Sequence, residues 1–210
     1  EDKGVISIGA GVTYTEAFAT LAKRIQALGP LFDRIGGEQV RNMGTIGGNI
    51  ANGSPIGDTP PPLIALGARL TLRKGKKRRT IPLETFFIAY GKQDRQPGEF
   101  VEAVHVPVPA KGEKFAVYKI TKRRDEDITA ALGAFCLTLA KDGTVADVRI
   151  AYGGMAATPK RASFVEQALL GRPWTEETVE TAMVEYTRDF TPLTDMRASA
   201  EYRALAAKNL

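Results

Sequence analysis

The stretch that decides the fold lies in the first half of the 210-residue chain, where residues 42–50 read NMGTIGGNI and residues 54–58 read SPIGD. Gly47 and Gly48 lack the Cβ atoms that would keep an anion away from bare backbone N–H groups. The segment is not a Rossmann fingerprint, because no apolar strand precedes it and a Ser-Pro pair interrupts any helix after it. A Gly-Gly pair on its own is more often a tight turn. The residues alone therefore leave two interpretations open, a phosphate-binding loop and a turn.

Glycines and prolines are frequent throughout residues 29–67, with little hydrophobic periodicity between them. A structureless connection of this length is uncommon in a compact protein unless it serves a site. Ile46, Ile50 and Ile56 make it too apolar for a solvated linker. We therefore expect a ligand-binding loop. At its end Asp58 precedes a Thr-Pro pair, which predicts a helix start with Asp58 as the N-cap.

The remainder of the first half reads as a lobe in which a mixed or antiparallel sheet is combined with helices. The predicted elements are a strand over residues 5–9, a helix from the capping box at Thr13 to Gly29, a hairpin over residues 70–83, and an extended segment over residues 101–108. We assign residues 1–110 to this lobe.

The second half, residues 111–210, predicts strands first and helices afterwards. The strands are expected over residues 116–121, 130–140 and 145–152, and the helices over residues 163–170, 176–188 and 199–208. A three-stranded antiparallel sheet followed by a helical part favours the α+β class over a doubly wound parallel sheet. Trp174 is predicted to pack between these helices.

Composition excludes several kinds of site. One cysteine, Cys136, rules out an intrachain disulfide, and with one histidine, His105, no cluster remains for zinc or an iron–sulfur centre. No apolar run reaches the roughly 18 to 20 residues that cross a bilayer, so we expect a cytoplasmic protein that does not bind membranes. The basic run over residues 73–79 lies at a predicted hairpin tip without aromatic residues, which favours a solvated turn over a nucleic-acid site.

Two further stretches follow the TIGGN and SPIGD segments in order. Residues 118–128 read YKITKRRDEDI, and residues 151–162 read AYGGMAATPKRA. Together the motifs resemble the FAD domain of xanthine dehydrogenases, aldehyde oxidases and related molybdenum hydroxylases, and the last motif looks specifically like xanthine dehydrogenase. The resemblance runs over nearly the whole chain.

This resemblance implies an FAD site. The residues that it assigns to the phosphates are Thr45, Gly47, Gly48 and Asn49, with Ile46 between them; Asp58 is assigned to the ribose or adenine, and Ile35, Val101 and Lys119 to further FAD contacts. Glu126 takes an acidic position beside the flavin ring. Taken without the resemblance, Asp58 is a helix cap, Lys119 a solvated strand residue, and residues 123–127 a self-neutralising surface turn.

The implied function is that of an oxidoreductase component. In such an enzyme a molybdopterin-binding large subunit oxidises xanthine or hypoxanthine, and electrons pass through the 2Fe-2S clusters of an iron–sulfur domain to FAD and then to NAD. Flavoproteins of carbon monoxide, nicotinate or aromatic acyl-CoA enzymes are the alternatives within the family, and a flavinless docking fragment is the alternative outside it. Nothing before residues 9–11 resembles the family's earlier glycine-rich loop. We therefore expect a sequence that starts part-way into the domain and an isolated chain that is inactive.

Overall fold

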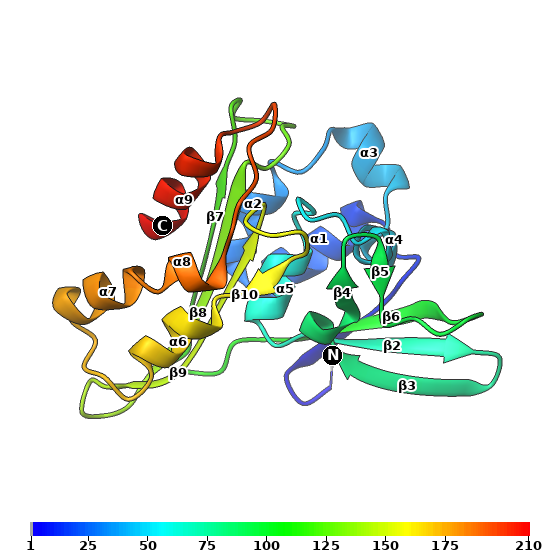
Figure 1. The fold of residues 1–210 in the computed structure, drawn as a ribbon. Coiled ribbons are helices and arrows are strands. Elements are labelled where there is room, and N and C mark those ends of the chain that lie inside the picture. Colours follow the sequence, from blue (N-terminus) through cyan, green and yellow to red (C-terminus); the bar gives the residue numbers. More distant parts are fainter. Residues whose placement is uncertain (1) are drawn as a thin grey trace.

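The computed structural model describes residues 2–210 as an α+β protein, as predicted, with one four-stranded sheet in each half of the chain. Figure 1 shows the two sheets at an angle to each other, with the short helices of the first half between them and the last helices on the far side of the second sheet. Among the described residues no helix is long and apolar enough to cross a membrane.

The first sheet is antiparallel throughout its described pairings. Its strands are β1 Val5–Gly9, β2 Arg69–Lys74, β3 Lys77–Pro82 and β6 Phe100–Pro107, in the order β1-β6-β2-β3. Val104 lies opposite both Ile8 and Leu70, and all three side chains are buried, which explains the apolar alternation in the sequence. Gly75 closes the predicted hairpin with a φ of 58°, a conformation that glycine adopts without strain. A 3-10 helix, η2 Leu83–Phe86, and a small sheet of β4 Phe87–Ala89 and β5 Lys92–Gln93 follow.

The three arginines of the basic run at this hairpin form ion pairs within the chain. Arg73 and Arg78 both pair with Glu102, at 2.7 and 2.6 Å. Arg79 pairs with Asp94 and Glu99. The arginines hold the pKa of the Glu102 carboxyl at about 2, chiefly through the hydrogen bond from Arg78. The run is thus a paired surface of the sheet, in agreement with the solvated-turn interpretation.

The helix predicted from Thr13 to Gly29 is shorter than expected. Helix α1 Tyr14–Arg24 begins at the Thr13 cap but ends where Ile25 leaves the helical region, with φ −131°. The chain continues as η1 Gln26–Leu28 and α2 Gly29–Phe32. Pro30 occupies the first turn of α2, where a missing N–H costs nothing, so this proline starts a helix instead of ending one.

The structureless loop predicted over residues 29–67 is also wrong. This stretch forms α2 and three more helices, α3 Glu38–Met43, α4 Ile46–Asn52 and α5 Pro60–Ala65. Each has seven residues or fewer, which is too short to display a helical hydrophobic period in the sequence. Gly53 ends α4 with a φ of 64°.

The second sheet contains the three predicted strands and one more. Its strands are β7 Lys114–Ile120, β8 Ala131–Leu139, β9 Val145–Gly153 and the two-residue β10 Lys160–Arg161, in the antiparallel order β10-β9-β8-β7. The helices are α6 Ser163–Leu169, α7 Glu176–Met183, α8 Tyr186–Asp189 and α9 Ala200–Lys208. The helix predicted over residues 176–188 is therefore broken into α7 and α8. These helices lie on one face of the sheet, and α5 packs against β8 and β9 on the other (Figure 1).

Helix α5 joins the two lobes through apolar contacts. Leu132, Ala134 and Ala151, from β8 and β9, belong to the same hydrophobic core as the first sheet and α5. A second core lies under α6 to α9. The boundary at residue 110 stays a prediction, since the first core extends across it.

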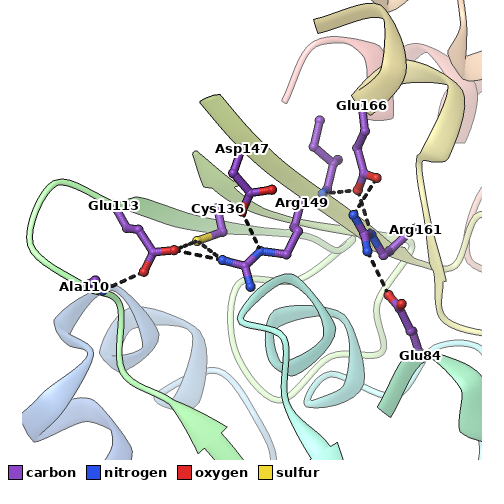
Figure 2. Close-up of polar contacts among 9 residues, drawn as sticks. Glu84, Ala110, Glu113, Cys136, Asp147, Arg149, Arg161 and Glu166 are labelled. Carbon is purple, nitrogen blue, oxygen red and sulfur yellow. Dashed lines mark hydrogen bonds and ion pairs between the residues drawn. The ribbon is translucent and has the colours of Figure 1, made fainter. Parts of the chain in front are cut away.

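A polar network lies at the junction of the lobes on the side of β9 and β10 (Figure 2). Arg149 pairs with Glu113 at 2.9 Å and contacts the Sγ atom of Cys136 at 3.6 Å. Arg161 pairs with Glu166 at 2.8 Å and reaches Glu84 of the first lobe at 3.2 Å. Cys136 is buried.

Candidate functional site

The TIGGN segment forms the N-terminus of α4, and its backbone N–H groups are already bonded. The four donor and acceptor pairs are Ile46 N to Val12 O (3.1 Å), Gly47 N to Ala10 O (3.0 Å), Gly48 N to Thr45 Oγ1 (3.0 Å) and Asn49 N to Thr45 O (3.0 Å). The expectation that these groups are bare is therefore wrong. They fix α4 to the segment after β1 and form its own N-cap.

The two adjacent glycines serve different purposes. A Cβ on Gly47 would lie 2.6 Å from the Cα of Ala10 and closer still to its Cβ, so Gly47 is required by the fold itself. Gly48 is exposed, and its Cβ would meet only the Thr45 side chain within 4 Å. The outer face of Gly48 is the place where a ligand can approach this backbone closely.

Two side-chain donors flank Gly48. The Thr45 hydroxyl accepts the Gly48 N–H and retains its own proton. The Asn49 Oδ1 accepts a hydrogen bond from the buried Thr59 hydroxyl, which leaves the Asn49 N–H groups for another acceptor. Within residues 2–210 no acceptor contacts either donor. Free hydroxyl and amide donors at the positive end of a helix suit a phosphate oxygen.

Asp58 and Lys119, 61 positions apart, form a buried ion pair beside this helix. The Lys119 Nζ lies 2.7 Å from Asp58 Oδ2, with side chains 2% and 15% exposed. Thr129 donates its hydroxyl proton to the other Asp58 oxygen. The helix-cap interpretation of Asp58 is wrong, because Thr59 precedes α5 and no side chain caps it. The interpretation of Lys119 as a solvated strand residue is also wrong, because its ammonium group is buried against Asp58 of the first lobe.

Tyr14, at the start of α1, is buried close enough to Asp58 for the carboxylate charge to affect its pKa. Burial, and to a lesser extent the charge of Asp58, raise the pKa of Tyr14 to about 12. The ring stacks on Phe18 with centroids 4.8 Å apart. Tyr14 is thus a buried core residue whose hydroxyl is neutral at physiological pH.

Arg34 is the residue of this region that sequence reasoning missed. Its guanidinium donates to Lys119 O at 2.7 Å, Thr121 Oγ1 at 2.8 Å and Arg124 O at 2.8 Å. Lys119 is therefore held twice by the first lobe, at its carbonyl by Arg34 and at its ammonium group by Asp58. No local pattern could have found Arg34, because its acceptors lie 85 to 90 positions away.

The segment after β7 is a compact turn. Asp127 accepts hydrogen bonds from the backbone N–H groups of Arg123 and Ile128, and the bond from Arg123 is the main reason that the Asp127 pKa falls to about 2. Glu126 has a φ of 53° and directs its carboxylate at Gly37, where an added Cβ would lie 3.0 Å from Oε1. Arg123 and Asp127 form the self-neutralising turn, while Glu126 faces the first lobe.

The structure brings five of the assigned residues together and leaves others apart. Those at the adjoining ends of α4, α5 and β7 are Thr45, Gly48, Asn49, Asp58 and Lys119. Ile46 and Gly47 are buried behind them, and Ile35 and Val101 are core residues. No group of three or more potential metal ligands occurs among residues 2–210.

Comparison with known proteins identifies the two halves. Residues 1–109 match the family model "FAD binding domain in molybdopterin dehydrogenase". Residues 116–210 match "CO dehydrogenase flavoprotein C-terminal domain".

The similar proteins include a xanthine dehydrogenase subunit, a nicotinate hydroxylase and a carbon monoxide dehydrogenase. The chain is 28% identical over 204 residues to a xanthine dehydrogenase FAD-binding subunit of Escherichia coli O157:H7, which covers 96% of the chain and 70% of that subunit. It is 38% identical over 147 residues to a nicotinate hydroxylase of Emericella nidulans, covering 68% of the chain and 11% of the fungal protein. A solved carbon monoxide dehydrogenase from Hydrogenophaga pseudoflava superimposes with a TM-score of 0.91 at 32% identity, covering the whole chain and 73% of the matched chain.

The chain thus spans about a tenth of the fungal relative and some 70% of the bacterial ones. The family model alone covers more than half of the chain, and it agrees with the resemblance found in the motifs. The chain belongs to the FAD-binding flavoprotein family of the molybdenum hydroxylases.

Proposed function

We propose that this chain holds the diphosphate of FAD at the N-terminus of α4, in an enzyme that oxidises xanthine or hypoxanthine and reduces NAD. The observation that carries the proposal is the open face of Gly48 between the free donors of Thr45 and Asn49. When bound, FAD would supply the redox chemistry, taking up electrons from iron–sulfur clusters and delivering a hydride to NAD.

Each assigned residue has a distinct part in this proposal. Thr45 and Asn49 donate to phosphate oxygens, and Gly48 leaves room for them. Gly47 and Ile46 fix the helix in place. Asp58 has acceptor capacity left for a ribose hydroxyl after its two bonds to Thr129 and Lys119.

The remaining assignments are Lys119, beside Asp58, and three residues outside this group. Lys119 keeps N–H groups beyond the one given to Asp58. Ile35 and Val101 are almost fully buried in the first core, so each offers FAD only the small exposed edge of its side chain. Glu126 brings a negative charge to the first lobe, where it can tune a bound flavin ring.

The similarity to a xanthine dehydrogenase FAD-binding subunit supports the choice of substrate. A nicotinate hydroxylase and a carbon monoxide dehydrogenase are also among the relatives, so these substrates are the alternatives. In all cases the partners are a molybdopterin-binding large subunit and an iron–sulfur domain. The substrate pocket belongs to the large subunit, so the present residues act on the flavin and its acceptor.

The test is Gly48→Val in the assembled enzyme. The branched side chain would fill the space beside Thr45, so we expect loss of FAD and of NAD reduction. Activity with an artificial acceptor that bypasses FAD should be retained, and the melting temperature measured without FAD should change little. Unchanged NAD-dependent turnover would falsify the phosphate-site proposal.

The acceptor and the substrate are tested separately on wild-type enzyme. Reoxidation of reduced flavin by NAD would support NAD as the electron acceptor. Reduced flavin that is not reoxidised by NAD would contradict only this part of the proposal. If the enzyme oxidises nicotinate or carbon monoxide but not xanthine, that compound is the substrate and the xanthine assignment is wrong. A correctly assembled enzyme without flavin would favour the docking-fragment alternative.

A further inference from the structure

A cavity of about 340 Å³ lies between the second sheet and the helices that cover it. Its walls are β7, β8 and β9 on one side and α6, α7 and the end of α9 on the other. Residues that line it include Phe135, Ile150, Leu169, Val179, Ala182 and Met183. The volume falls in the range of about 300–1,000 Å³ that is typical of small-molecule sites.

This cavity is separate from the flavin site. Successive residues of a strand point to opposite faces of its sheet, so Tyr118 of β7 lines the cavity while Lys119 faces Asp58. Helix α5 covers the other face of β8 and β9. The two sites thus share a sheet and occupy its opposite faces.

The cavity walls are largely apolar, and the buried tyrosine hydroxyls behind them are already paired. The Tyr186 hydroxyl bonds with that of Tyr152, which in turn donates to Ala207 O, so Tyr186 presents its ring to the cavity. No buried polar group of the walls therefore calls for water, and an apolar occupant loses no hydrogen bonds there.

Two aromatic side chains lie at the edge of the cavity. Trp174 was predicted to pack between helices, but it is 46% exposed and lines the cavity together with the exposed Tyr118. Contact with an apolar ligand would bury the exposed ring surface of both side chains, which is favourable. A ligand in the cavity would cover part of the exposed Trp174 ring.

The charged side chains that line the cavity have one sign. Lys114, the first residue of β7, and Lys208, the last residue of α9, line it, and no acidic side chain of the described chain does. Neither ammonium group forms an ion pair within residues 2–210. An apolar body with a single negative group is the complementary ligand.

We propose that the cavity binds a small carboxylate with an apolar body, such as a medium-chain fatty acid. The body lies between the sheet and α7, and the carboxylate contacts Lys114 and Lys208. Binding is independent of FAD, since no proposed flavin residue lines the cavity.

The ligand chemistry is tested by calorimetric titration of the flavoprotein with decanoate, decanol and decylammonium. These probes share a body and differ in charge. We expect decanoate to bind about threefold to tenfold more tightly than decanol, because partly exposed ion pairs contribute modestly, and decylammonium to bind most weakly. Equal affinity for decanoate and decanol, or no saturable binding of decanoate up to about 1 mM, would overturn the proposal.

The location is tested by filling the cavity. Ala182→Leu and, independently, Val179→Phe should weaken decanoate at least about tenfold, because the larger side chains take up the ligand's space. Lys114→Gln combined with Lys208→Gln should weaken decanoate and leave decanol unchanged, and the exposed Lys141→Gln is the matched control. Undiminished decanoate binding in folded Ala182→Leu and Val179→Phe proteins places the ligand elsewhere and overturns the proposal. FAD affinity should stay unchanged in all four variant proteins.

Discussion

The two lobes are joined by two ion pairs of different character. Lys119 and Asp58 meet beside the proposed flavin site, where the lysine is almost fully buried and contacts one carboxylate. Arg161 and Glu84 meet at the other junction, with side chains 29% and 38% exposed (Figure 2). Arg161 also holds Glu166 through two hydrogen bonds.

The difference lies in what remains when one partner is removed. Without Asp58, the Lys119 charge stays in a buried place with neither water nor a second carboxylate. Without Glu84, Arg161 keeps Glu166 and access to water. Because Lys119 is desolvated, removal of Asp58 should lower the free energy of unfolding strongly, whereas removal of Glu84 should lower it little. The flavin-side junction should therefore tolerate little change, and the other junction should tolerate much.

The largest expected effect is that of Asp58→Ala, which should cost about 3–5 kcal/mol of unfolding free energy. Asp58→Asn should cost less, about 1–3 kcal/mol, because a neutral acceptor remains for Lys119 and Thr129. Urea denaturation of the apo protein measures both. A helix cap would make Asn equivalent to Asp, so an unchanged Asp58→Asn midpoint would restore the cap interpretation and break the comparison.

The next largest effect is expected for Gly47→Ala, because side-chain packing beside the proposed flavin site should be as sensitive to substitution as the Asp58–Lys119 ion pair. The new methyl group would run into Ala10, and overpacking of this kind should cost about 2–3 kcal/mol. Gly48→Ala is the matched control, with an expected change within about 1 kcal/mol because only the Thr45 hydroxyl must move. Equal losses in thermal melts of the two variants would contradict the different purposes assigned to the glycines.

Arg34→Gln should have a smaller effect, about 1–2 kcal/mol, from the loss of hydrogen bonds to a partly buried carbonyl and a turn. The characteristic result is local. Hydrogen exchange of residues 121–127 should accelerate while exchange in β8 stays unchanged. Arg123→Gln, at a side chain that is largely exposed, is the control and should stay within about 0.5 kcal/mol of wild type. Uniform acceleration across the sheet would mean that Arg34 stabilises the whole fold and not this turn.

The smallest effect is expected for Glu84→Gln at the other junction, less than about 1 kcal/mol. Its dependence on salt should be weak as well, because Arg161 retains Glu166. A loss comparable to that of Asp58→Ala in the same urea titration would show that exposure does not distinguish the two junctions.

Much of the fold follows from local patterns. Alternating apolar residues predicted β2, β3, β8 and β9 correctly, and the turn at Gly143, with a φ of 83°, closes the predicted hairpin of the second sheet. Helices α2, α3 and α4 were missed because none is long enough for a period to be recognised, whereas the Thr-Pro pair after Asp58 predicted the start of α5. β10, with two residues, was missed for the same reason.

The candidate site divides in the same way. By itself the sequence determined the TIGGN segment, the α+β class and the family, because motifs and periodicity are properties of neighbouring residues. Only the tertiary structure decided that Gly47 serves the fold and Gly48 faces outward, that Asp58 pairs with Lys119 instead of capping a helix, and that Arg34 holds the turn after β7. Those facts depend on which distant atoms share a desolvated space, and the free energy of a charge or a methyl group is set by that space.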